Sequence, residues 1–142
     1  VISPLHWRRT YDAFSMMPCW KSTYPIVAWD IYRYYNDERI LEEHYEGIKK
    51  LVAFLGDNSI NQIISKGLGD HMEPQPGGWS SETPKHTPPL VTSTAIYYYD
   101  TWIAAKAAEI LDKPEEARYY SELAEKIKEA FNKKLLNKRT NQ

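Results

Sequence analysis

Apolar side chains recur at helical spacing in the first half of the chain. Over residues 22–36 they fall three and four positions apart, and Pro25 is compatible with a helix because it lies in the first turn. The apolar positions there are Ile26, Val27, Trp29, Ile31, Tyr32 and Tyr35. Over residues 38–55 one apolar stripe is flanked by charged residues, which predicts an amphipathic helix. Its stripe consists of Leu41, Tyr45, Ile48, Val52 and Leu55.

The second half of the chain predicts two more helices. One covers about residues 92–111 and can be capped by Thr92 or Ser93. The other covers about residues 113–135, and Pro114 suits its first turn. Their apolar positions are Ile96, Tyr99, Trp102, Ile103, Ala107, Ile110 and Leu111, then Ala117, Tyr120, Leu123, Ala124, Ile127, Ala130 and Phe131. The sequence therefore predicts an all-α fold of two antiparallel helical hairpins.

The two hairpins resemble each other. Asp37 and Asp112 lie at corresponding turns, and Tyr45, Ile48 and Val52 correspond in order to Tyr120, Leu123 and Ile127. Repeated helix pairs are typical of helical solenoids and closed toroids, and such stacks need roughly three repeats. We therefore interpret residues 1–142 as a single partial domain, cut from a longer protein. Its unburied helix faces predict that the isolated chain self-associates or is partly molten.

Composition narrows the classes of function. The 142 residues have a formal net charge of -1 with positive and negative side chains interleaved, which argues against a nucleic-acid or anionic membrane partner. No apolar run approaches the roughly 20 residues of a membrane span, and the sequence leaves the cellular location open. Cys19 is the single cysteine, which excludes an intrachain disulfide and a cysteine-rich zinc site. Nothing in the sequence indicates a cofactor.

The candidate chemistry lies in a long segment, residues 57–89, between the hairpins. This segment is rich in glycine, proline, serine and threonine, and a compact domain rarely has so long a loop without a functional reason. It contains Gly67-Leu68-Gly69-Asp70-His71, and Trp79 follows. Glycines let the backbone approach a ligand closely, and Asp70 and His71 supply hydrogen-bonding groups. These residues predict a polyol-binding site; the alternative is that Asp70 only forms a turn.

The same loop contains residues that suit two other chemistries. His71, Glu73 and His86 could be assembled as metal ligands, but their spacing matches no known metal motif, so no metal site is predicted. Asp70 and Glu73 could be imagined as the two carboxylates of a glycosidase. Inverting enzymes hold these about 6.5–9.5 Å apart on opposite faces of the sugar, which neighbours on one loop seldom achieve.

Aromatic composition adds one more candidate. The chain has 5 Trp and 11 Tyr against 3 Phe, and rings with a polar atom suit clefts that are half apolar and half wet. Trp20 precedes the first predicted helix, where its indole could stack on the C–H face of a sugar. The alternative is burial against that helix, the more common fate of a tryptophan.

Several motifs together resemble a known family. They are Pro18-Cys19-Trp20-Lys21-Ser22, Pro25-Ile26-Val27-Ala28-Trp29-Asp30-Ile31-Tyr32, Tyr34-Tyr35-Asn36-Asp37, Arg39-Ile40-Leu41-Glu42-Glu43-His44-Tyr45 and Gly67-Leu68-Gly69-Asp70. In order and spacing they resemble the catalytic domain of bacterial α-L-rhamnosidases of glycoside hydrolase family 78. The resemblance extends from about Pro18 to the last hairpin.

This resemblance implies part of an (α/α)6 toroid, the six-hairpin glycosidase fold, and an inverting hydrolase that releases terminal α-L-rhamnose with two carboxylates. It implies that the general acid and base lie outside this chain, and that Trp20 and Asp70 contact the carbohydrate substrate, with His71 beside Asp70. His71 stands where the family usually has tryptophan, and Trp79 is a candidate to restore the aromatic face. Lys21 and Asn36 replace usual glycines. The competing interpretations are another α/α-toroid carbohydrate enzyme and a non-catalytic helical-repeat interaction module.

Overall fold

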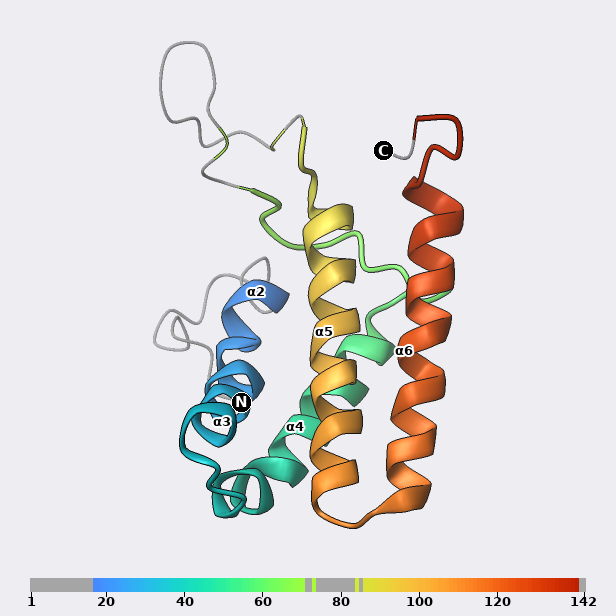
Figure 1. Ribbon diagram of the computed structural model, residues 1–142. Coiled ribbons are helices and arrows are strands. Elements are labelled where there is room, and N and C mark those ends of the chain that lie inside the picture. The colour runs from blue at the N-terminus through green and yellow to red at the C-terminus, as the bar shows by residue number, and fades with distance from the viewer. Residues whose placement is uncertain (1–16, 71–72, 74–83, 85, 141–142) are drawn as a thin grey trace.

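The computed structural model describes residues 17–70, 73, 84 and 86–140, and every structural statement below concerns these residues. They form α2 (Pro18–Lys21), α3 (Thr23–Tyr35), α4 (Arg39–Asp57), α5 (Pro89–Ile110) and α6 (Pro114–Leu135). Helices α3 and α4 form one hairpin and α5 and α6 the other, with α5 between α2 and α6 in Figure 1. The described part of the chain contains no strand, so the all-α prediction is confirmed.

Two helix boundaries differ from the sequence prediction. Residues 18–21 form a separate helical turn that the periodicity did not reveal, because one turn is too short to show a period. Helix α5 begins at Pro89, so Thr92 and Ser93 lie inside it and the prediction that either caps it is wrong. Pro89 has the fixed φ that suits a first helical position, and the helix starts there without a capping side chain.

The turn between α3 and α4 depends on Asn36. Its backbone is left-handed, with φ 53°, and its N–H donates to the Tyr32 carbonyl at 2.7 Å to end α3. Asparagine tolerates this conformation better than most residues other than glycine, which explains why it can replace the glycine expected there. Asp37 then accepts hydrogen bonds from the Arg39 backbone and guanidinium, and this pairing lowers the pKa of the Asp37 carboxyl.

Helix α5 is the centre of the core. It packs against α2, α3, α4 and α6, and its buried residues lie on several sides of the helix. Ile103, Ala104, Ala107 and Ala108 have no exposed surface. The alanines allow close approach of neighbouring helices. A helix that is apolar on most sides is buried, as observed here.

Helices α4 and α6 are amphipathic and bury one face each against α5. The buried positions of the α4 stripe are Leu41, Tyr45, Ile48, Val52 and Leu55, as the sequence predicts. Lys49 of α4 bridges to Glu116 of α6 at 3.1 Å. The Tyr45 hydroxyl and then Lys49 lower the pKa of Glu116. Helices α4 and α6, the second helices of the two hairpins, are thus joined by an ion pair while both pack on α5.

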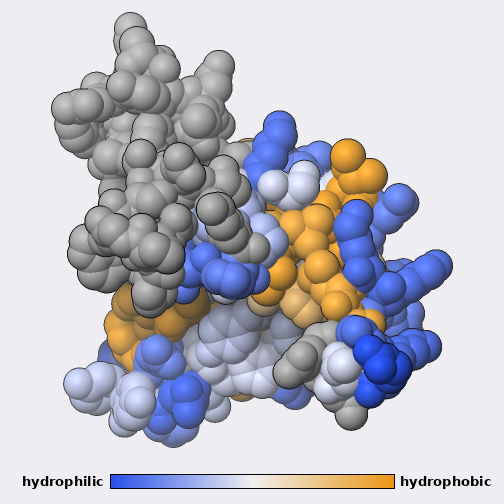
Figure 2. All heavy atoms as spheres, turned by 90° about the horizontal axis from the view of Figure 1, so that it is seen from above, coloured by the Kyte–Doolittle hydropathy of each residue, from blue (hydrophilic) through white to orange (hydrophobic). Residues whose placement is uncertain are grey.

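Helix α3 is less buried than the number of its apolar residues suggests. Ala28 and Trp29 are buried, but Val27 is 49% exposed and Tyr35 is 79% exposed. Figure 2 views the molecule from above and shows hydrophobic and hydrophilic residues side by side on that face. Tyr35, an apolar position at helical spacing, is therefore not part of the core among the described residues. No helix in the described part of the chain is long and apolar enough to cross a membrane.

Replacement of a fully buried α5 side chain should destabilise the fold. We expect Ile103→Ala to lower the free energy of unfolding by about 2–5 kcal/mol, because it leaves a cavity in the core cluster around α5. The matched control is Ile60→Ala, since Ile60 is 77% exposed and loses little contact. Denaturant unfolding followed by circular dichroism checks the difference; equal midpoints for the two variants would contradict the central burial of α5.

Candidate functional site

Trp20 lies on the single turn of α2. Its residue surface is 46% exposed, so the predicted alternative of burial against the first helix does not hold. The turn is closed by backbone hydrogen bonds from Trp20 and Lys21 to the Met17 carbonyl, at 3.2 and 3.3 Å. The Lys21 ammonium extends to within 5.2 Å of the Phe54 ring centroid on α4. The Trp20 indole is thus exposed, while the side chain of the next residue is held against α4.

A buried hydrogen-bond network joins α2 to the middle of α5. Ser22 follows α2 and is 1% exposed, and Asp100 of α5 has no exposed surface. Ser22 Oγ lies 2.5 Å from Asp100 Oδ2 and 2.9 Å from the Pro18 carbonyl oxygen. The residue that ends the Trp20 turn is therefore fixed to the central helix.

The protonation of Asp100 follows from its surroundings. Burial raises the pKa of Asp100 to about 7, and the hydrogen bond with Ser22 opposes that rise. A hydroxyl has one proton and cannot donate to both Asp100 and Pro18. When Asp100 is protonated it donates to Ser22 Oγ, and Ser22 donates to the Pro18 carbonyl, so both contacts are satisfied together.

The Gly67–Asp70 segment lies against the same end of the molecule. Gly67 has φ 136°, and a Cβ there would meet Ser93 Oγ and lie 3.5 Å from Pro18 Cδ. Gly69 has φ 65°, and a Cβ there would lie 2.6 Å from the Thr87 carbonyl oxygen. Both positions need glycine for conformation and for space. The segment is consequently packed between α2 and the start of α5.

Hydroxyl groups in the first turns of α5 hold the preceding segment. Ser93 Oγ donates to the Lys66 carbonyl at 2.8 Å, and the Ile64 N–H donates to Thr94 Oγ1 at 3.1 Å. Ser93 and Thr94 are 3% and 0% exposed. Instead of capping the helix as predicted, Ser93 anchors the loop that leads to Asp70.

Glu73 fixes the other side of the loop. Its carboxylate accepts hydrogen bonds from the backbone N–H groups of His86, at 3.0 and 3.1 Å, and Thr87, at 2.9 Å. Asp70 N–H donates to the Thr87 carbonyl at 3.0 Å, and Glu73 N–H donates to the Asp70 carbonyl at 3.0 Å. Glu73 is 7% exposed. The carboxylate thus stabilises the loop by joining residues distant in sequence, which is a structural role.

The Gly67–Asp70 segment meets α2 at Pro18, two residues before Trp20. The other two predicted site residues, His71 and Trp79, lie outside the described residues. Groups of three or more potential metal ligands are absent from the described part of the chain. The arrangement therefore offers an exposed indole and an acidic loop, features suited to binding a polyol.

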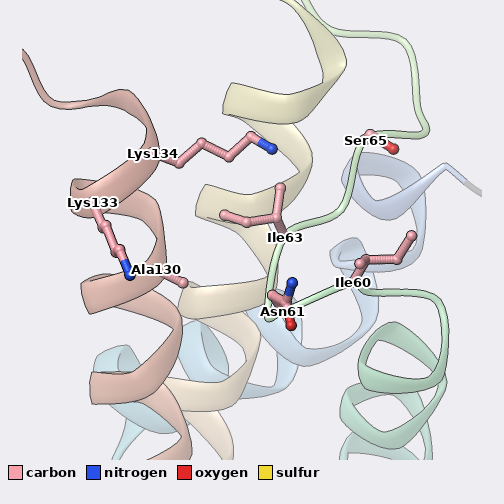
Figure 3. Close-up of a pocket in the computed structure, with 7 residues that line it drawn as sticks. All are labelled: Ile60, Asn61, Ile63, Ser65, Ala130, Lys133 and Lys134. Atoms are coloured by element: carbon pink, nitrogen blue, oxygen red, sulfur yellow. The ribbon is translucent and has the colours of Figure 1, made fainter.

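A separate cavity of about 770 Å3 opens between residues 60–65 and the last turns of α6 (Figure 3). Lys133 and Lys134 project from α6 on one side, and Ile60 and Asn61 lie on the opposite side. The described residues lining it include no aromatic ring and no carboxylate. None of the predicted site residues lines this cavity.

Sequence reasoning missed the Ser22–Asp100 pair. One signal was present: Asp100 is a lone carboxylate inside an otherwise apolar helical run, between Tyr99 and Thr101. A carboxylate on a helix that must be buried needs a partner. The sequence could not identify Ser22 as that partner, because the two residues are 78 positions apart.

The comparisons with known proteins agree with one another. Residues 1–142 match the family described as bacterial alpha-L-rhamnosidase 6 hairpin glycosidase domain. Two proteins named alpha-L-rhamnosidase from Formosa agariphila are 32% identical over 117 residues and 30% identical over 114 residues, covering 79% and 78% of this chain and 12% of each relative. The solved structure of alpha-L-rhamnosidase from Dictyoglumus thermophilum superposes with a TM-score of 0.77 and 44% identity, over 86% of this chain and 13% of that one.

The Asp100 carboxyl should make stability depend on pH. Its folded pKa of about 7 lies above the ordinary 3.8, so the folded state retains a proton that the unfolded chain releases between these values. The stabilisation is complete below pH 4 and is lost as the pH rises towards and through 7. Each pKa unit corresponds to about 1.4 kcal/mol, so we expect a loss of a few kcal/mol across this window.

Asp100→Asn removes this titration because its amide can donate to Ser22 Oγ at every pH. Melting temperatures at pH 5 and pH 8 should therefore differ less in this variant than in the wild type. Asp112→Asn is the control, because Asp112 is exposed and asparagine tolerates its left-handed φ of 53°. Parallel pH profiles for wild type and Asp100→Asn would show that Asp100 does not titrate in this range.

Proposed function

The chain belongs to the family of bacterial α-L-rhamnosidase six-hairpin glycosidase domains, and on that premise we propose that its parent protein hydrolyses terminal α-L-rhamnose from glycosides or polysaccharides. The observation that carries the proposal is the family match over all of residues 1–142. The chain spans 12% of the length of the curated relatives, so this segment supplies one part of the domain. The all-helical hairpin pairs agree with an (α/α)6 toroid.

The role we propose for this segment is contact with the sugar. Trp20 forms a wall of the rhamnose subsite, where its exposed indole stacks on the C–H face of the ring. Asp70 lies at the rim and accepts hydrogen bonds from sugar hydroxyl groups. His71 and Trp79 complete the proposed set. The glycines at 67 and 69 and the Glu73 hydrogen bonds support this role because they hold the Asp70 loop in one conformation.

The hydrolysis itself is proposed to be inverting, with the general acid and base supplied from outside this segment. Two buried carboxylates of the described chain already have structural interactions. Asp100 has no exposed surface, and Glu73 accepts backbone hydrogen bonds that secure the loop. An inverting pair must reach opposite faces of the sugar about 6.5–9.5 Å apart, with water on one side.

Substitution of Trp20 tests the sugar-contact role. In the parent enzyme we expect Trp20→Ala to lower kcat/KM on a nitrophenyl α-L-rhamnoside by roughly tenfold or more, the equivalent of about 1.4 kcal/mol, with an unchanged melting temperature. Tyr34→Ala is the matched control because Tyr34 is an aromatic residue that is 77% exposed at the far end of α3. Equal kinetics for Trp20→Ala and Tyr34→Ala would remove Trp20 from the site.

The substrate class requires a separate assay. A panel of nitrophenyl glycosides should be hydrolysed by the parent protein only when the sugar is α-L-rhamnose, while this chain alone should be inactive. Turnover of another sugar by the parent would retain the toroid and reject rhamnose, as expected for another carbohydrate enzyme of this scaffold. Turnover by this chain alone would place the catalytic carboxylates within residues 1–142.

A further inference from the structure

A second groove lies between the second helices of the two hairpins. It is formed by the end of α4, by Tyr97 of α5 and by the early turns of α6. Its volume is about 310 Å3, just within the range of about 300–1,000 Å3 that small-molecule sites occupy. In Figure 1, α6 and α2 lie on opposite sides of α5, so this groove is distinct from the Trp20 end of the fold.

The groove has an exposed aromatic wall. Tyr119 is 60% exposed, and its ring packs edge-on against Tyr120, with 5.0 Å between ring centroids. Because Tyr120 is buried, this contact orients the Tyr119 ring while leaving its other surface open. An aromatic surface presented in this way suits the apolar C–H face of a pyranose ring.

Polar groups line the opposite part of the groove. Asp57 and Gln62 offer a carboxylate and an amide, which together can accept from and donate to sugar hydroxyl groups. Tyr97 donates its hydroxyl proton to Gln62 Oε1 at 3.3 Å. That bond leaves the Gln62 amide N–H groups for another acceptor.

The backbone fixes Gln62 at the edge of the groove. Ile60 and Ile63 exchange backbone hydrogen bonds at 2.9 and 3.1 Å around a two-residue turn. The turn residues Asn61 and Gln62 both have positive φ, 51° and 65°. This is the pattern of a tight hairpin turn, and glutamine is an uncommon residue in it. The conformation holds the Gln62 side chain beside Tyr97.

The charge of the groove selects among ligands. Asp57 is the one charged side chain among the described residues that line it, so uronic acids and sulfated sugars would be repelled. The larger cavity beside Lys133 and Lys134 has the opposite charge and lacks an aromatic wall among its described lining. We propose that the groove formed by Tyr119, Asp57 and Gln62 is a second carbohydrate-binding site, which holds a neutral sugar residue of a polymeric substrate away from the Trp20 site.

This inference rests on the proposed function for its substrate class, and a binding assay separates the two. The parent protein is run by affinity electrophoresis in gels that contain a neutral polysaccharide, dextran bearing attached α-L-rhamnosyl groups, and its turnover is measured with a nitrophenyl α-L-rhamnoside. We expect Tyr119→Ala to weaken retention by roughly threefold or more while kcat/KM on the small substrate stays within about twofold. Tyr119→Phe, which keeps the ring, should retain most of the binding.

Two further variants complete the test. Gln62→Ala should weaken retention as Tyr119→Ala does, and Tyr34→Ala, which removes an exposed aromatic ring elsewhere, should leave it unchanged. Unchanged retention in both Tyr119→Ala and Gln62→Ala overturns the second site. Equal loss in Tyr119→Ala and Tyr34→Ala also overturns it, because the effect would not be local. Lack of rhamnoside turnover with Tyr119-dependent retention would reject the proposed hydrolase and keep the binding site.

Discussion

The burial of α5 on several sides is the constraint on which the rest of the structure depends. Four other helices contact it, and its fully buried alanines let them approach closely. A helix in this position cannot shift without disturbing both hairpins. Residues that α5 directs towards its neighbours are therefore held in fixed positions, whether they belong to the core or to a site.

The same helix contributes to both proposed carbohydrate sites. Near its start, Ser93 and Thr94 bind the loop that leads to Asp70, and in its middle Asp100 binds Ser22 beside the Trp20 turn. On another side, Tyr97 orients Gln62 in the groove against α6. These polar groups are buried and bond to loop backbone or to a distant side chain, so the helix helps to order the loops in addition to the loops' own glycines and Glu73.

What the sequence could predict depended on whether the information was local. The α4 stripe was predictable because one face is buried and the other solvated, so the period of 3.6 is visible. The exposure of Tyr35 on α3 was not, because an apolar position at helical spacing looks the same whether or not a neighbour covers it. The 18–21 turn was too short to show periodicity. The Ser22–Asp100 contact was hidden because the partners are 78 positions apart in the sequence. That Trp20 and Asp70 contact one sugar came only from the family resemblance, and it stays a prediction.

The two departures from expected glycines have different physical meanings. Asn36 adopts the left-handed backbone that a glycine would adopt, so the turn is retained at little cost. Lys21 instead adds a long cationic side chain immediately after Trp20, and that side chain reaches across to the Phe54 ring on α4. Its ammonium lies over the face of that ring, a favourable contact between a cation and an aromatic ring. Lys21 therefore changes the surroundings of the Trp20 turn, whereas Asn36 keeps the backbone conformation of its own turn.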